Sequence, residues 1–267
     1  MLLSVAIPIL MKVSFPEEVS PQTRMVFDVI ENLPDGSNVL LSYDFDPASE
    51  GELLPMAQAF TRHCSAKGHK QYYMTLWPLG SPMVDKSLDT IRSEYPDMIY
   101  GEDFVKFDYK AGGEVVIRVI GTDLRAMFPL DSSGVSLDEL PMTKNIKNLQ
   151  DMDVIVNVSA GDPGTKQWVQ FASTPYSLTT VSGCTGVQAP QMYPYIPEQL
   201  AGVLGAIKAA AEYEQAIAEK YPEIASNPSA QEAKRRMGPQ LIAHSLMVGL
   251  ILLGNWIFFV SRKRGEA

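Results

Sequence analysis

Short polar and glycine-rich segments follow three apolar runs of the chain, and they hold the residue types that could bind or transform a ligand. Residues 44–46 (DFD) end the first run, residues 161–166 (GDPGTK) follow the second, and residues 182–186 (SGCTG) end the third. If these runs are parallel strands, the segments meet at one edge of a sheet, where glycines admit a ligand and helix N-termini favour an anion. The same residue types also serve ordinary strand-to-helix turns, so a ligand crevice and plain turn chemistry both stay open. The candidate pocket comprises Asp44, Asp46, Ser49, Trp77, Gly161, Asp162, Thr165, Lys166, Gly183, Cys184 and Thr185.

Known phosphate-binding motifs do not fit these segments. In residues 161–166 only two residues separate the glycines and the last pair is Thr-Lys, whereas a P-loop has four residues between its glycines and ends in Lys-Ser or Lys-Thr. Asp44 and Asp46 would repel the phosphate of flavin mononucleotide. These two carboxylates with Asp162 are an alternative site for a hard divalent cation, although acidic turn residues are common without a metal. We predict no cofactor and no resident metal.

Cys184 raises the question of thiol chemistry. Residues 182–185 look like the Gly-Cys-Thr segment of aspartate/glutamate racemases, in which a thiol at a strand end removes a proton. That chemistry needs a second thiol on the opposite side, and Cys64 falls near the end of a predicted helix, away from the carboxyl edge. Cys184 is better interpreted as a small, half-buried residue at a strand end.

Apolar segments bounded by turn residues alternate with segments of helical periodicity, and this alternation predicts the element order. A series of strand–helix units implies a parallel sheet with helices on both faces, because each crossover is right-handed. We expect a flavodoxin-like, doubly wound, mostly parallel five-stranded sheet with strand order 2-1-3-4-5. The polar connection 131–147 is long enough to be a lid. The predicted strands are 38–46, 71–77, 104–108, 153–160 and 178–182, and the predicted helices are 50–67, 82–95, 112–127, 165–172 and 198–220.

The C-terminal part of the chain has the length and composition of a transmembrane helix. Residues 241–260 (LIAHSLMVGLILLGNWIFFV) carry no charge, and twenty residues at about 1.5 Å each span roughly 30 Å, the thickness of a bilayer's hydrocarbon core. Three basic residues lie on each side of the run, where they suit lipid headgroups. We predict a globular domain over residues 19–226, a basic tether over 227–239, a membrane helix over 240–261 and a basic tail over 262–267.

The apolar segment 1–18 leaves the topology open. Its apolar run of eleven residues is too short to span a bilayer, and it lacks the charged start and cleavage site of a signal peptide. We expect it to be the end of a longer membrane helix, with interfacial binding and docking on the domain as alternatives. Because the basic flanks of the C-terminal helix are equal, the single-pass and two-pass forms both fit. A two-pass chain with residues 262–264 in the cytoplasm has its domain outside, which we favour, and a single-pass tail anchor equally allows a cytoplasmic domain.

The predicted membrane helix also carries polar and small residues that could contact another helix. His244 and Asn255 are eleven positions apart and fall within about 20° of one face. Ser245 and Gly249 form a small-xxx-small pair on an adjoining stripe, where a second helix could approach closely. Because polar groups in hydrocarbon are unfavourable, His244 and Asn255 either face protein or reach the interfaces. We expect the lipid bilayer and a membrane protein, or a second copy of the chain, as partners.

Seven short segments across the chain support a family resemblance: 33–37 (LPDGS), 54–57 (LPMA), 62–64 (RHC), 74–78 (MTLWP), 100–103 (YGED), 110–114 (KAGGE) and 182–186 (SGCTG). On these segments the chain resembles a family of prokaryotic membrane-anchored α/β proteins for which no activity is established. The resemblance implies the α/β architecture and a full N-terminal membrane helix.

Two classes of function follow. The formal net charge of −9 argues against nucleic acid, which binds to basic surfaces. Because each catalytic pattern fails on its residues, we favour a non-catalytic, membrane-anchored domain that is a subunit or scaffold of a membrane assembly. The alternative is a sensor or enzyme that binds a small ligand at the carboxyl ends of the strands.

Overall fold

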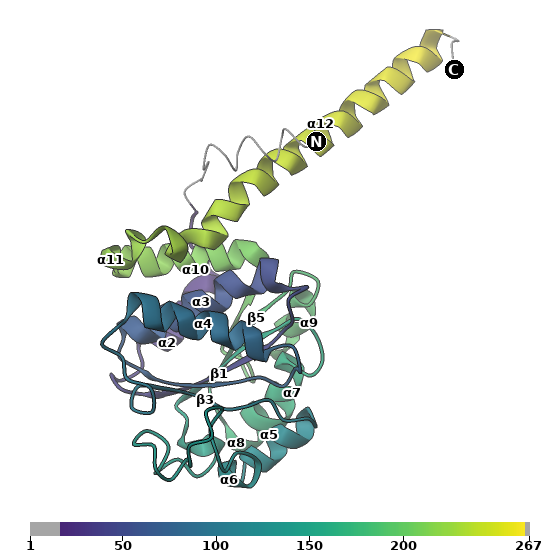
Figure 1. Ribbon diagram of the computed structural model, residues 1–267. Helices are drawn as coiled ribbons and strands as arrows, with labels where there is room; N and C mark the ends of the chain where they lie inside the picture. Colours follow the sequence, from purple (N-terminus) through teal and green to yellow (C-terminus); the bar gives the residue numbers. More distant parts are fainter. Residues whose placement is uncertain (1–16, 265–267) are drawn as a thin grey trace.

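The computed structural model describes residues 17–264 and contains one parallel sheet at its centre (Figure 1). The prediction for the apolar segment 1–18 therefore lies almost entirely outside the described residues. The six strands follow the spatial order β3-β2-β1-β4-β5-β6, and every neighbouring pair is parallel. Their bounds are β1 (Asn38–Asp44), β2 (Lys70–Met74), β3 (Phe104–Lys106), β4 (Val154–Ser159), β5 (Thr180–Cys184) and β6 (Gly202–Gly205).

The α/β class and the doubly wound sheet are confirmed, but the strand count and strand order differ from the prediction. The sheet has six strands rather than five, and β3 pairs with β2 at the edge instead of inserting between β1 and β4. The additional strand β6 lies in a segment that was predicted as helix. It has only four residues, two of them glycine, so it carries little strand signal.

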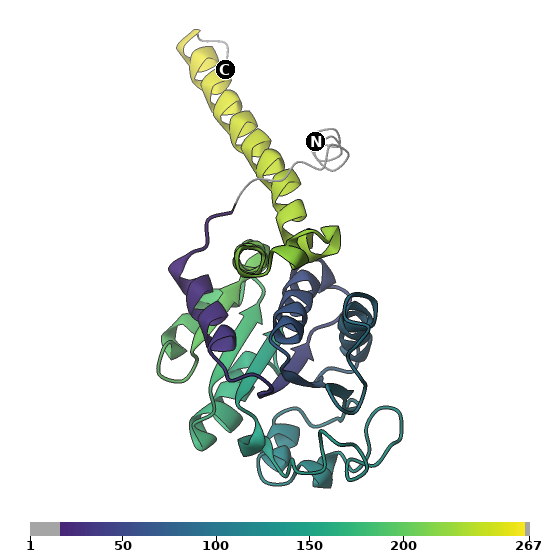
Figure 2. The same cartoon turned by 90° about the vertical axis from the view of Figure 1, so that its left-hand side faces the viewer.

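Helices cover both faces of the sheet because the chain reverses direction across it. The chain first moves from β1 out to β3, and then returns to β4 beside β1, so right-handed crossovers place the two series of helices on opposite faces. The last helix of the domain returns to the first face (Figure 2). The first face carries α2 (Pro21–Glu31), α3 (Glu50–Ala66), α4 (Ser81–Glu94) and α10 (Ala206–Lys220), and the second carries α5 (Glu114–Ile120), α6 (Leu124–Met127), α7 (Thr165–Trp168), the π-helix η2 (Val169–Ser173) and α8 (Thr174–Tyr176).

The connection 131–147 is a packed cover rather than a free lid. Four of its apolar side chains are buried in the core of the second face. The Arg125 guanidinium of α6 donates to main-chain carbonyls of Thr143 (3.1 Å) and Lys144 (3.3 Å) and also to that of Ile146. The remaining short elements are η1 (Leu149–Asp151), α9 (Ala189–Met192), η3 (Tyr193–Tyr195), α11 (Pro222–Ala225) and η4 (Pro228–Gln231).

The chain ends in one long helix, α12 (Glu232–Arg264), which projects away from the domain (Figure 1). Among the described residues, one helical stretch, Pro228–Lys263, is long and apolar enough to cross a membrane, and its most apolar window is not buried at all. This confirms the predicted long apolar helix. The predicted tether 227–239 is not a loose linker, because η4 and the first turns of α12 occupy it. Ala230 and Ala233 belong to the core of the first face, so the folded body extends past residue 226.

Candidate functional site

The structure brings the predicted strand-end residues to one edge of the sheet. Asp44 at the end of β1 pairs in register with Ser159 of β4, and Ser159 pairs with Cys184 of β5. The three residues are therefore direct neighbours at the carboxyl edge, as the sequence predicted for Asp44 and Cys184. Whether the edge binds a ligand depends on which of these side chains have free polar atoms.

Asp44 is completely buried, and both oxygens of its carboxylate accept hydrogen bonds from donors within the protein. Oδ1 accepts the backbone N–H of Leu76 at 2.7 Å, and Oδ2 accepts the Asn157 amide at 2.6 Å and the Trp168 indole N–H at 3.0 Å. The Ser42 hydroxyl lies 2.9 Å from Oδ1 and donates to the same group. Burial raises the pKa of Asp44 to about 6, although each of these hydrogen bonds lowers it. The carboxylate thus ties β1, β4, α7 and the turn after β2 together.

Thr165 extends this buried network across the sheet. Its hydroxyl donates to Oδ1 of Asn157 at 2.8 Å and lies 2.5 Å from the Ser182 hydroxyl and 3.0 Å from the Ser159 hydroxyl. Thr165 also donates its backbone N–H to Ser159 Oγ at 3.2 Å. The network therefore connects the ends of β1, β4 and β5. Its hydrogen bonds occupy the polar atoms that would otherwise be free to bind a ligand.

Sequence reasoning missed the partners of Asp44. Ser42 with Asp44, Asn157 with Ser159, and Ser182 with Cys184 are each two residues apart on a strand, so each pair points to the same face. This alternation of polar residues within apolar runs was visible in the sequence. Trp168 gave no comparable signal, because its indole meets Asp44 only through the packing of α7.

Trp77 and the loop after β4 pack on each other. The indole N–H of Trp77 donates to the carbonyl of Pro163 at 2.7 Å, and a Cβ at Gly161 would lie 3.2 Å from the Trp77 ring. The backbone N–H of Gly164 is bound by the Gln167 side chain at 2.9 Å. The glycines of this loop therefore make room for protein groups such as the Trp77 ring, and they do not line an open space for a ligand.

The β5 end is similarly closed. A Cβ at Gly183 would lie 2.1 Å from the Met56 sulfur, so any side chain there would displace Met56 of α3 from its packing on the sheet. Cys184 is buried, and burial raises the pKa of its thiol to about 12, which leaves it protonated and unreactive at neutral pH. Cys64 is buried on the first face, which does not supply the opposing thiol of a racemase.

The remaining predicted residues lie at the surface of this edge. Asp162 and Lys166 are exposed, and Ser49 and Thr185 are partly exposed. Ser49 precedes α3 but its side chain makes no capping bond. Instead, Oδ1 of Asp46 accepts the backbone N–H groups of Ala48 (3.1 Å) and Ser49 (3.3 Å). None of the described residues forms a group of three or more candidate metal ligands, which leaves the alternative cation site without a cluster.

The observed strand order is that of dinucleotide-binding Rossmann folds, in which the turn after β1 binds the pyrophosphate. In such folds this turn carries glycines that let the backbone approach the pyrophosphate at a helix N-terminus. Here residues 44–50 (DFDPASE) supply no glycine, and Glu50 and Glu52 lie in the first turn of α3. Carboxylates at this position repel phosphate, so the residues do not fit a dinucleotide.

A second polar cluster joins the body to α12. Glu214 of α10 is buried, and its carboxylate accepts the backbone N–H of Ala233 at 2.9 Å and that of Lys234 at 3.0 Å. These are two of the N–H groups that have no partner within a helix at its first turn. Burial raises the pKa of Glu214 to about 8, while the two N–H groups and the nearby charges of Arg62 and Lys234 lower it. A side chain of the body therefore caps the helix that leaves it.

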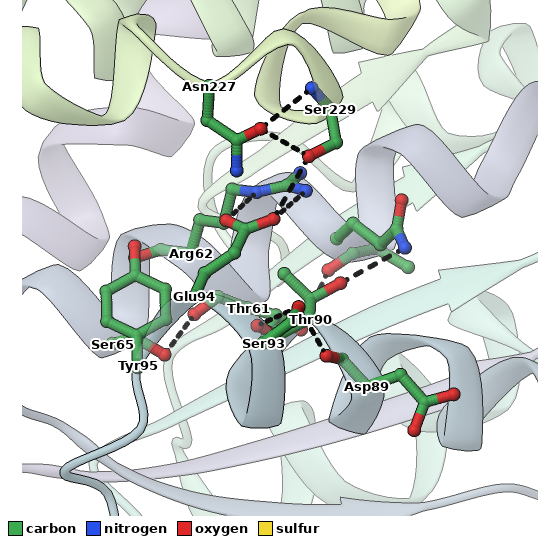
Figure 3. Close-up of polar contacts among 12 residues, drawn as sticks. Thr61, Arg62, Ser65, Asp89, Thr90, Ser93, Glu94, Tyr95, Asn227 and Ser229 are labelled. Atoms are coloured by element: carbon green, nitrogen blue, oxygen red, sulfur yellow. Dashed lines mark hydrogen bonds and ion pairs between the residues drawn. The ribbon is translucent and has the colours of Figure 1, made fainter.

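An ion pair near this cap connects α3 and α4 with the segment before α12 (Figure 3). Arg62 of α3 donates from Nε and from Nη2 to the two oxygens of Glu94 of α4, each at 2.8 Å. Their side chains are only 3% and 15% exposed. The Ser229 hydroxyl donates to the same Glu94 carboxylate at 3.2 Å, and the Asn227 side chain accepts the Ser229 N–H at 3.1 Å. The Glu94 carboxylate of α4 therefore connects Arg62 of α3 with Ser229 of η4.

The basic residues before the apolar run are also attached to the body. Lys234 donates to the Gln215 side chain of α10 at 2.6 Å. The Arg236 guanidinium donates to the carbonyl of Gly51 in α3 and, at 2.9 Å, to Glu232 within α12. The junction, defined as Glu214, Arg62, Glu94, Ser229 and residues 232–239, holds the start of α12 at several points.

The four predicted membrane-helix contacts lie beyond the junction. His244, Ser245, Gly249 and Asn255 are all exposed, and a Cβ at Gly249 would have no atom within 4 Å in the described part of the chain. Comparisons with protein-family models, with curated proteins and with solved structures give no match for this chain.

Proposed function

We propose that this chain is a membrane-anchored α/β domain that acts as a non-catalytic subunit or scaffold of a membrane assembly. The observation that carries the proposal is α12. Its first turns are capped and packed by the body, and the same helix then continues as an exposed apolar run. An exposed apolar helix of this length is stable in lipid or against other membrane helices and unfavourable in water.

The filled carboxyl edge favours this function over the alternative of a small-ligand sensor or enzyme. Asp44 and Thr165 form their hydrogen bonds with other protein groups, such as the N–H of Leu76 and the side chain of Asn157. Cys184 is a buried, protonated thiol. A catalytic group has to reach a substrate with a free polar atom. At this edge the buried polar groups stabilise the fold.

A rigid connection to the membrane suits a scaffold. A flexible linker would let the domain sample many orientations, whereas a helix continuous with a docked junction fixes one. The stripe of Ser245 and Gly249 with the polar His244 and Asn255 provides a lateral contact for a helix of a partner or of a second copy. We also propose that the domain lies on the extracytoplasmic side, as in a two-pass chain whose basic residues 262–264 are cytoplasmic.

The test is the size of the particle that contains the full chain. The chain is extracted from its native membrane in a mild detergent, and the protein mass is measured by light scattering with correction for bound detergent. The proposal predicts a protein mass above that of one chain, and a shift to one chain in the double variant Gly249→Leu/Asn255→Leu. A single chain in the unmodified protein contradicts the assembly.

A further inference from the structure

The apolar run of α12 begins very close to the folded body. Met237 packs against the core of the first face, Gly238 and Pro239 are buried, and the charge-free run starts at Leu241. Two residues of helix cover about 3 Å. The headgroup layer on each side of the hydrocarbon core is about 5–8 Å thick. If α12 crosses the bilayer, part of the body therefore has to lie within the headgroups.

The contacts of the junction identify which part of the body this is. Arg236 of α12 donates to the carbonyl of Gly51 in the first turn of α3. One residue further, Glu52 accepts the backbone N–H of Gly186 at 2.9 Å, and Gly186 belongs to the turn between β5 and α9. Figure 1 shows α12 rising across α10 and leaning towards the side on which α9 lies. The turn 185–188 is thus next to the point where α12 leaves the body.

This turn exposes an apolar side chain to an unusual degree. Val187 is 83% exposed, more than any other large hydrophobic residue of the described chain, including those of the apolar run of α12. Tyr193, which follows α9, is 54% exposed, and Lys208 at the start of α10 is exposed as well. A Cβ at Gly186 would lie 3.2 Å from that of Ala206 at the start of α10, and Tyr193 and Lys208 line one pocket together with Gly205, so the turn and these two side chains share one region of the surface. An apolar side chain with a tyrosine and a lysine in the same region is the combination that lies at a lipid–water interface.

Three acidic residues nearby are paired within the protein, among them Glu212, whose buried carboxylate lies 3.7 Å from the Lys208 ammonium group. Glu52 is bound by the N–H of Gly186, and Glu50 forms an ion pair with Lys86 at 2.6 Å. We propose that Val187, Tyr193 and Lys208 form a lipid-headgroup contact that fixes the orientation of the domain on the bilayer. The inference rests on the proposed membrane anchor, because α12 has to be inserted for the body to reach the headgroups.

The experiment places a thiol probe on the full chain. Cys64 and Cys184 are buried, so a fluorescent maleimide labels an introduced cysteine selectively. The variant Val187→Cys is compared with the control Asn145→Cys, an exposed position in the cover of the opposite face. Each labelled chain is reconstituted into vesicles of phosphatidylcholine and phosphatidylglycerol that contain a lipid spin-labelled on its headgroup. No other protein is present, so quenching reports lipid alone.

We expect severalfold stronger quenching at position 187 than at position 145. In the double variant Val187→Cys/Lys208→Glu, the added negative charge should reduce quenching at position 187 and leave the labelled control unchanged. Equal quenching at the two positions in chains that resist carbonate extraction overturns the headgroup contact and leaves the anchor standing. Loss of the unlabelled chain from the vesicles on carbonate extraction overturns the anchor and the contact together.

Discussion

Removal of the Glu214 carboxylate should release the start of α12 from the body. In Glu214→Ala the backbone N–H groups of Ala233 and Lys234 lose their acceptor. The body loses no other hydrogen bond of this side chain, because both oxygens serve these two groups. The substitution therefore acts on the junction, and the sheet and its network at Asp44 should be unaffected.

The size of the effect follows from the two stranded donors. A buried donor without a partner costs about 1–3 kcal/mol, and the bond to Lys234 is only partly buried. Burial raises the pKa of Glu214 to about 8, so the carboxyl group is largely neutral at pH 7 and accepts more weakly than a charged carboxylate, which keeps the loss towards the lower part of that range. We expect the junction to be destabilised by about 2–3 kcal/mol, a factor of roughly 30 to 150 in its opening equilibrium.

Trypsin measures this opening because Lys234, Arg235 and Arg236 lie in the docked first turns of α12. When opening and closing are fast relative to cleavage, the cleavage rate is proportional to the open population. The control is Glu219→Ala on the same helix, whose side chain is 49% exposed and pairs with Arg24 at the surface. Such a pair contributes at most about 1 kcal/mol. Cleavage of Glu214→Ala at the rate of Glu219→Ala would refute the capping argument.

Three further predictions concern the Arg62–Glu94 ion pair, the buried Asp44 carboxyl group and the membrane helix. Arg62→Ala leaves the poorly exposed Glu94 without its partner and should lower the free energy of unfolding by about 2–4 kcal/mol. The control Arg92→Ala removes an exposed ion pair and should lower it by under about 1 kcal/mol, so equal urea midpoints of the two variants would contradict this prediction. Asp44 has a folded pKa of about 6, above its unfolded value, so the stability from its protonated form is complete below pH about 4 and is lost as the pH rises through 6. Between pH 4 and 7 the free energy of unfolding of the wild type should therefore fall by roughly 2–4 kcal/mol relative to that of Asp44→Asn, as measured in paired urea titrations. A difference between the two proteins that stays constant with pH would contradict the raised pKa of Asp44. Gly249→Leu and Asn255→Leu should each weaken crosslinking between helices in membranes, and unchanged crosslinking in both would leave α12 as a plain anchor.

The sequence predicts most of the elements, because their periodicity is local. Four of the five predicted strands coincide closely with β1 to β4, and the fifth overlaps β5. Strand order is a different matter, since the pattern of β3 is the same whether it pairs with β2 at the edge or inserts beside β1. The four-residue strand β6 escapes prediction because Gly202 and Gly205 weaken its signal and the helix α10 follows at once.

The candidate site shows the same limit. The position of Asp44 at a strand end was predictable, and its burial was not, because the donors come from Leu76, Asn157 and Trp168 on three other elements. The capping of α12 by Glu214 is also a tertiary event. It joins residues 19 and 20 positions apart across α11 and η4, which no local capping pattern spans.

Membrane partition tests the central claim most directly. The full chain and a chain that ends at Gln240, which keeps the junction and lacks the apolar run, are expressed in cells, and their membranes are washed with alkaline carbonate. The anchored-domain account predicts that the full chain stays in the membrane pellet, while the shortened chain is soluble without detergent and retains its folded circular dichroism. Recovery of the full chain in the carbonate supernatant would contradict it.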